Sequence, residues 1–130
     1  MDGGRMTPAI SDDEAAIDLA RLSEILGEDD PDEIRAHLDM FFSHFPPLID
    51  QLEIALAAMD RNAIRIAAHT ATGAAGMAGA LALQGVLSRI ETAACAGDTL
   101  DAVSAISQVR SEYARVQAFV ADGGLADGPH

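Results

Sequence analysis

The sequence contains no lysine and no tryptophan, and besides four histidines its only basic residues are eight arginines. Against these stand 21 aspartates and glutamates, which give a formal net charge of −13 at pH 7. A surface of this sign repels phosphate backbones and anionic membranes, because like charges raise the free energy of approach. We therefore expect neither a nucleic acid nor a membrane surface as a partner.

Cysteine is equally scarce. The single cysteine, Cys95, excludes an internal disulfide and a zinc site built from cysteines, and its apolar helical surroundings indicate a small core or boundary residue. His37 and His44 are seven residues apart, which is about 10 Å along a helix. Two ligands of one metal ion must each lie about 2 Å from it. We therefore predict surface histidines at these positions and no metal site.

Several signatures of catalysis and of targeting are also missing. The sequence has no glycine-rich phosphate loop after a strand, no Ser-His-Asp arrangement and no His-Glu-x-x-His motif, so it indicates no self-sufficient active site. No apolar run approaches the roughly 20 residues needed to span a membrane. The start Met1-Asp2-Gly3-Gly4 lacks the apolar core of a signal peptide. We expect a cytoplasmic protein.

What the chain has in abundance is alanine. Apolar residues make up 49% of the sequence but aromatic residues only 4%, a composition that suits closely packed helices and suits a β-sandwich poorly. With 130 residues the chain is long enough for one domain with a hydrophobic core. We predict a single all-α domain over residues 14–121. Residues 1–13 and 122–130, which contain glycine and proline without periodicity, are predicted to be disordered.

Helix signals in the first half of the domain define two or three segments. A short helix is expected at about 18–26, with Gly27 as its end, and a longer helix begins at Asp30-Pro31. Pro46-Pro47 should break or kink this longer helix, because each proline removes an amide donor and clashes with the preceding turn. The residues up to about Met59 therefore form either two consecutive helices or one bent helix.

Three more helices are predicted at about 61–78, 80–96 and 99–120. Asp60 and the pair Gly97-Asp98 supply caps at their boundaries. Long helices joined by turns of two or three residues pack as antiparallel neighbours, which predicts an antiparallel up-down four-helix bundle with one or two extra N-terminal helices. In the last helix we expect one apolar line to face the core: Leu100, Val103, Ile106, Val109, Tyr113, Val116 and Val120.

The predicted helix at 61–78 carries the most informative pattern. His69 lies among small residues on one face, with Gly73 one turn later and Gly76 beyond it. A glycine inside a helix costs about 0.5–1 kcal/mol relative to alanine, so these glycines serve something other than helix stability. They either admit another helix beside a surface histidine or give a partner access to a reactive one. The opposite face is predicted to be buried: Ile64, Ala67, Ala68, Ala71, Ala75 and Ala78.

The run Ala68-His69-Thr70-Ala71-Thr72-Gly73-Ala74-Ala75, with Gly79 ten residues after the histidine and Gly97-Asp98 later, resembles the signature of histidine-containing phosphotransfer (HPt) domains. That signature is roughly alanine-histidine, two residues, lysine-glycine, then small residues and a second glycine. The resemblance extends from about Ile17 to Phe119. It has one departure, since Thr72 stands where the family usually has lysine.

The resemblance implies that His69 is the phosphoacceptor. An imidazole accepts a phosphoryl group through an unprotonated ring nitrogen, and an unperturbed histidine, with a pKa of about 6.5, is mostly neutral near pH 7. In a hairpin of two helices centred near Ala80, His69 and Glu91 are equally far from the centre and should lie at similar height. Glu91 then either accepts a hydrogen bond and orients the imidazole, or is a solvated surface carboxylate.

Partner-binding residues are expected around the histidine, namely Arg65, Thr72, Gly73 and Gly76. The lysine of the family signature places a positive charge near the phosphohistidine, whereas Thr72 offers only a hydroxyl. Arg65, one turn before His69 on the same face, is the candidate replacement for that charge.

The resemblance also defines the expected role and partners. Domains of this family have no nucleotide site, metal or cofactor of their own, so the implied role is a phosphoryl carrier rather than an enzyme. The exchange takes place with the aspartate of a response-regulator receiver domain, whose bound Mg²⁺ assists the transfer, or with a hybrid sensor histidine kinase. We expect a monomeric, stand-alone phosphorelay intermediate. The alternatives are a substrate domain of a chemotaxis-type histidine kinase, a receiver-binding adaptor that works without phosphorylation, and a purely structural bundle.

Overall fold

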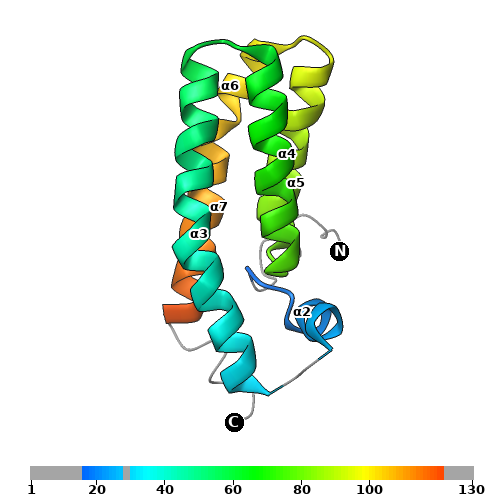
Figure 1. Ribbon diagram of the computed structural model, residues 1–130, viewed down its shortest axis with the longest axis vertical. Coiled ribbons are helices and arrows are strands. Elements are labelled where there is room, and N and C mark those ends of the chain that lie inside the picture. Colours follow the sequence, from blue (N-terminus) through cyan, green and yellow to red (C-terminus); the bar gives the residue numbers. More distant parts are fainter. Residues whose placement is uncertain (1–15, 28–29, 122–130) are drawn as a thin grey trace, which may run out of the picture.

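The computed structural model describes residues 16–27 and 30–121, and the regular structure within them is entirely helical (Figure 1). The predicted disordered segments, 1–13 and 122–130, lie outside the described residues. None of the described helices combines the length and the apolar character needed to cross a membrane. The helices are α2 (Leu19–Leu26), α3 (Pro31–Ala57), α4 (Arg61–Met77), α5 (Leu81–Cys95), α6 (Thr99–Ser104) and α7 (Ile106–Ala121).

Four rods form the body of the molecule: α3, α4, α5 and the consecutive pair α6 and α7 (Figure 1). Short turns at 58–60, 78–80 and 96–98 join them, so each rod runs antiparallel to the one before it. Helix α2 lies outside this bundle, beyond the end of α4 (Figure 1). The predicted all-α, up-down four-helix bundle is therefore confirmed, with one extra N-terminal helix.

Helix α3 is continuous through Pro46 and Pro47. Of the two predicted alternatives, the structure thus contains one helix and not two. Each proline leaves a carbonyl in the preceding turn without its usual amide donor, a local cost that favours a break. Phe41, Phe45 and Ile49 are buried on both sides of the prolines, and packing of this shared apolar face keeps the helix intact. Its N-terminal part inclines toward α2 (Figure 1).

The last rod differs from the prediction of one helix at 99–120, because it is divided at Ala105 into α6 and α7. The amide of Ala105 donates to the carbonyl of Ala102 at 3.2 Å, and the hydroxyl of Ser104 donates to the carbonyl of Asp101 at 2.8 Å. Both are tight local bonds that compete with the regular α-helical ladder. The prediction that Leu100 faces the core is wrong, since this residue is 74% exposed. Ala102 and Ala105 take the inward positions instead.

The turn between α4 and α5 is where α2 joins the bundle. Gly79 has a left-handed φ of 72°, and its carbonyl accepts a 2.8 Å hydrogen bond from the amide of Asp18. A Cβ at Gly79 would lie 3.1 Å from the carbonyl oxygen of Asp18 and 3.2 Å from the Cβ of Leu22. Glycine is therefore needed here both for the turn and for the close approach of α2.

Four of the five aromatic residues gather between α3 and α7. The ring of Tyr113 lies 6.1 Å, 6.2 Å and 5.1 Å, centroid to centroid, from the rings of Phe41, Phe42 and Phe45. Burial in this cluster raises the pKa of Tyr113, because the phenolate form is poorly solvated there. These ring contacts hold α7 against the middle of α3.

Candidate functional site

Helix α4 presents His69 to solvent. Asp60 caps the helix by accepting a 3.1 Å hydrogen bond from the amide of Ala63. The side chain of His69 is 74% exposed. The opposite face of the helix is fully buried at positions three and four apart: Ile64, Ala68, Ala71 and Ala75. Packing of that face holds the helix in place and leaves the histidine on the outer surface.

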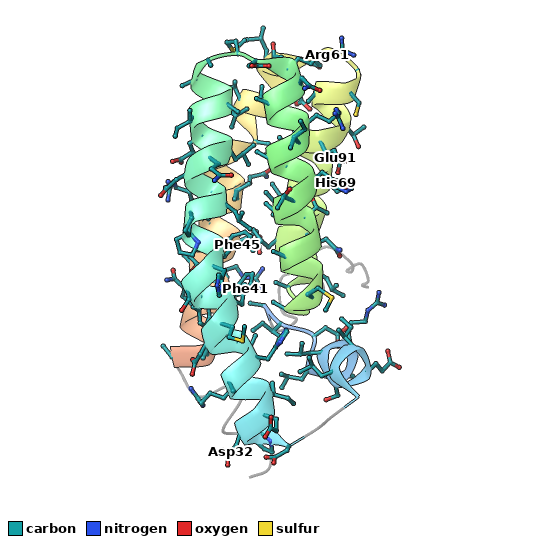
Figure 2. All side chains as sticks on the ribbon, in the orientation of Figure 1. Asp32, Phe41, Phe45, Arg61, His69 and Glu91 are labelled. Atoms are coloured by element: carbon teal, nitrogen blue, oxygen red, sulfur yellow. The ribbon has the colours of Figure 1, made fainter. Side chains whose placement is uncertain are left out.

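The start of α4 is tied to the end of α5 through Arg61 (Figure 2). Its Nε donates to the carbonyl of Ala94 at 2.7 Å, and its Nη2 donates to the carbonyl of Cys95 at 2.6 Å. Carbonyls in the last turn of a helix lack intrahelical amide partners, so Arg61 acts as a cap supplied by a neighbouring helix. The thiol-bearing residue Cys95 is exposed, which corrects its interpretation as a core or boundary residue.

The structure brings His69 and Glu91 together. Nδ1 of His69 lies 2.8 Å from Oε2 of Glu91, which is 25% exposed (Figure 2). An ionised carboxylate can only accept a hydrogen bond, so Nδ1 carries the proton and donates it. In the neutral ring the unprotonated nitrogen is then Nε2, on the side of the imidazole away from Glu91. The hydrogen bond to Glu91 therefore leaves Nε2 as the nitrogen with a free lone pair on a largely exposed ring.

Gly73 and Gly76 lie on the exposed side of α4 but differ in what surrounds them. A Cβ built at Gly73 has no atom within 4 Å, so this position is open to the outside. A Cβ built at Gly76 would lie 2.3 Å from Nε2 of Gln84 on α5. Gly76 therefore accommodates the Gln84 side chain, whereas Gly73 leaves space one turn after His69.

The two remaining predicted site residues make local contacts. Nη2 of Arg65 donates to Oδ1 of Asn62 at 2.9 Å, so the guanidinium is directed toward the start of α4. The hydroxyl of Thr72 donates to the carbonyl of Ala68 at 2.6 Å, so its hydrogen is already used within the helix. Arg65 therefore lies one turn from His69 without being bonded to it, and Thr72 contributes no charge.

The sequence prediction missed a groove between α3 and α4. It encloses about 170 Å³, and Met40 and Met77 at its edge are 61% and 52% exposed. Met77 follows His69 and Gly73 in steps of four, so this spacing was the available signal for a continuous outer surface. The residues that line the groove are His37, Met40, Phe41, His44, Phe45, Ala74, Met77 and Ala78.

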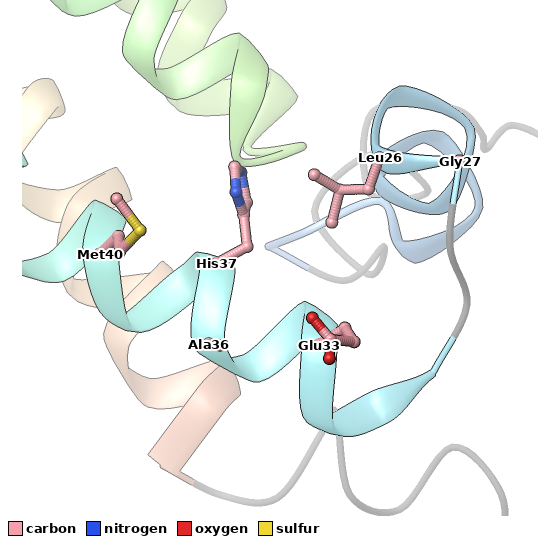
Figure 3. Close-up of a pocket in the computed structure, with 6 residues that line it drawn as sticks. All are labelled: Leu26, Gly27, Glu33, Ala36, His37 and Met40. Carbon is pink, nitrogen blue, oxygen red and sulfur yellow. The ribbon is translucent and has the colours of Figure 1, made fainter.

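A second hollow of about 480 Å³ continues from His37 and Met40 toward α2 (Figure 3).

The two histidines of α3 bond to the backbone. Nε2 of His37 donates to the carbonyl of Met77 at 2.9 Å, and Nδ1 of His44 donates to the carbonyl of Met40 at 2.9 Å. The two histidines thus bond to different backbone carbonyls. Across residues 16–27 and 30–121, no three His, Cys, Asp or Glu side chains are grouped so that they could hold a metal ion.

A family model for the Hpt domain matches residues 36–119, well over half of the chain. The chain belongs to the Hpt domain family. The match begins within α3, ends within α7 and includes both His69 and Glu91. No curated protein and no solved structure matches the sequence.

Membership in the Hpt family indicates the general role of this domain. Hpt domains take part in histidine phosphotransfer within phosphorelays and interact with receiver domains and kinases. They carry phosphoryl groups rather than catalyse a reaction by themselves. Within the part of the chain that the family model matches, His69 carries an exposed imidazole on α4.

Proposed function

We propose that this Hpt domain carries a phosphoryl group on Nε2 of His69. It accepts the group from the aspartyl phosphate of a receiver domain or hybrid sensor kinase and passes it to a response-regulator receiver. The hydrogen bond between Nδ1 of His69 and Glu91 supports this proposal most directly, because it leaves Nε2 of an exposed ring unprotonated.

The loading step needs no base from the Hpt domain. Nε2 of His69 attacks phosphorus, the P–N bond forms, the P–O bond to the aspartyl group breaks, and the aspartate leaves as a carboxylate. Nδ1 keeps its proton, so the phosphorylated ring is positively charged, and the carboxylate of Glu91 stabilises that charge. The receiver would supply the Mg²⁺ that neutralises the transferring group, while the Hpt domain supplies the nucleophile and the docking surface.

The proposed docking surface is an uncharged stretch of α4 and α5. From Ile66 to Ser88 the chain contains no aspartate, glutamate, lysine or arginine, although its net charge is −13. Ile66, Thr70, Gly73 and Met77 are exposed along this stretch and lead into the groove at the edge of α3. A partner that docks there would strip water from few charged groups. We propose that Arg65, Thr72, Gly73 and Gly76, which surround the histidine, contribute to the contact.

Two phosphoryl donors of different size test the proposal. Phosphoramidate is a small chemical donor, and a ³²P-labelled receiver domain is a protein donor. Both should label the wild-type protein with acid-labile, alkali-stable phosphate, and His69→Gln should abolish the label. His44→Gln is the matched control for the acceptor, because it changes an exposed histidine of α3, and phosphoramidate should label it like the wild type. Glu91→Ala should slow labelling more than Glu91→Gln, which keeps an acceptor oxygen.

The same experiment distinguishes a phosphoryl carrier from an adaptor that binds a receiver without being phosphorylated. A receiver that binds the domain but never labels it, with phosphoramidate equally inactive, would exclude the phosphoryl carrier and leave an adaptor. Label that persists in His69→Gln or maps to His37 would show that the acceptor has been assigned to the wrong residue.

A further inference from the structure

A phosphoryl group on His69 would enter an unfavourable electrostatic environment. It brings a charge of about −1.5 to −2 at pH 7, and the whole chain already carries −13. The charged group that faces the imidazole from α5 is the carboxylate of Glu91, 2.8 Å from Nδ1. Apart from the phosphorylated ring itself, whose positive charge is already paired with Glu91, the stretch from Ile66 to Ser88 supplies no cation. Compensation from within α4 must therefore come from its first turns.

Arg65 is the arginine of α4 that lies one turn before His69. Residues four apart on a helix are surface neighbours, with Cβ atoms about 5–6 Å apart. Helical side chains also lean toward the N-terminus, so a group attached to His69 extends over the turn that contains Arg65. The phosphoryl group would therefore be directed toward the guanidinium.

The present partner of Arg65 is neutral. Its Nη2 donates to the amide oxygen of Asn62 at 2.9 Å. Arg89 and Arg110, in contrast, are paired with the carboxylates of Asp101 and Glu53. A hydrogen bond between a guanidinium and an anionic oxygen is roughly twice as strong as one between neutral groups, and an amide oxygen competes poorly with a dianion.

Packing does not enclose the Arg65 side chain. On the side of Asn62 it borders a hollow of about 450 Å³ between the start of α4 and the end of α5, which is lined by Asp60, Arg61, Asn62, Arg65 and Cys95. The neighbouring Thr72 does not offer the phosphate a hydroxyl hydrogen, because it donates to the carbonyl of Ala68. Rotation of Arg65 away from Asn62 therefore breaks one hydrogen bond and brings the available cation to the phosphate.

We propose that Arg65 is the phosphate-binding cation of this domain and that it exchanges partners on phosphorylation. Asn62 holds the guanidinium while His69 is unmodified, and the phosphoryl group takes it over once the P–N bond has formed. This inference rests on the proposed function of His69.

The ionisation of the phosphoryl group provides the test. The 130-residue chain is labelled with phosphoramidate, whose P–N bond breaks with release of ammonia as the new P–N bond to Nε2 forms. The phosphoryl pKa is then followed by ³¹P NMR during a pH titration. The charged or titratable groups around His69 and Arg65 are Glu91, which bonds to the imidazole, and Asp60, Arg61 and Cys95, which line the hollow beside Arg65. All four stay constant across the variants. Arg65→Ala should lower the acid dissociation constant about two- to fivefold, the range for an exposed ion pair. Arg65→Lys should restore most of the change.

A matched control separates the local effect from net charge. Arg21→Ala removes the same charge from an exposed position of α2 and should titrate like the wild type. In the unsubstituted protein, phosphorylation should also shift the NMR signals of the Asn62 side-chain amide, and this shift should disappear in Arg65→Ala.

Two failures can be distinguished. If His69 takes up no phosphate, the proposed function itself is wrong. If His69 is labelled but Arg65→Ala titrates like Arg21→Ala and the Asn62 amide does not respond, the carrier function stands and the role of Arg65 is overturned.

Discussion

Replacing Gly73 with alanine should stabilise the folded domain. A Cβ at this position meets no atom within 4 Å, and a helix interior favours alanine over glycine by about 0.5–1 kcal/mol. With an unfolding entropy of about 2.1 cal/mol/K per residue, roughly a hundred ordered residues give about 0.2 kcal/mol/K. The midpoint of thermal unfolding should therefore rise by about 2–5 °C, as measured by circular dichroism.

A larger side chain at the same position should separate stability from transfer. Gly73→Gln places a side chain one turn from His69, on the surface proposed to meet the receiver. Small displacements of reacting groups slow a reaction strongly, so transfer from a phosphorylated receiver should fall about ten- to a hundredfold. Labelling by phosphoramidate should not change, because the small donor needs no docking surface. Equal losses with both donors, or undiminished transfer from the receiver, would refute the idea that Gly73 leaves space for the receiver beside His69.

Gly76→Ala is the matched control for the stability argument. Its Cβ would lie 2.3 Å from Nε2 of Gln84, so the Gln84 amide has to move. That movement is possible for the end of a flexible side chain, but it offsets part of the gain in helix propensity. The unfolding midpoint should therefore rise less than in Gly73→Ala, and the opposite order would show that open space at Gly73 has been misjudged.

Two further predictions concern the scaffold. Arg61→Ala removes two hydrogen bonds to carbonyls at the end of α5 and should lower the free energy of unfolding by roughly 1–2 kcal/mol in urea titrations, whereas the control Arg21→Ala should not. Tyr113 is the only tyrosine and there is no tryptophan, so near-ultraviolet absorbance follows its ionisation directly. Burial raises its pKa in the folded state, so this contribution to stability is present below the unfolded pKa of about 10 and is lost as the pH rises through the folded pKa. A Tyr113 pKa in the folded protein at or below that in the urea-unfolded chain would contradict this.

Much of the fold followed from local patterns, because caps and apolar periodicity act within one or two turns. The cap at Asp60 and the buried alanines of α4 are examples. Tertiary packing decided what local patterns left open or misassigned. It keeps the prolines of α3 inside one helix, one of the two predicted alternatives, since their neighbours share one buried face. The prediction for Leu100 was wrong, because this residue lies on the outer side of α6 and Ala102 is buried instead.

For the candidate site, the sequence predicted the relative placement of His69 and Glu91 but not the side-chain contacts around them. Helix periodicity placed His69 on the outer face, and the symmetry of the α4–α5 hairpin placed Glu91 at the same height. The role of Glu91 in orienting the ring stays a prediction. Periodicity could not indicate that Arg65 bonds to Asn62, because side-chain rotamers and polar partners depend on the three-dimensional surroundings. The groove beside Met40 also depended on how α3 is placed against α4.

The two faces of α4 carry separate tasks, and this separation explains why glycine is tolerated beside the histidine. Ala68, Ala71 and Ala75 are fully buried and hold the helix in the bundle. Two glycines on the exposed side weaken the helix by about 1–2 kcal/mol in total, but they remove no contact from the buried side. Filling the open position at Gly73 should therefore raise stability while it reduces transfer from a protein donor. A site built on buried contacts would lose both properties together, so opposite signs in these two measurements are the signature of a surface kept clear for a partner.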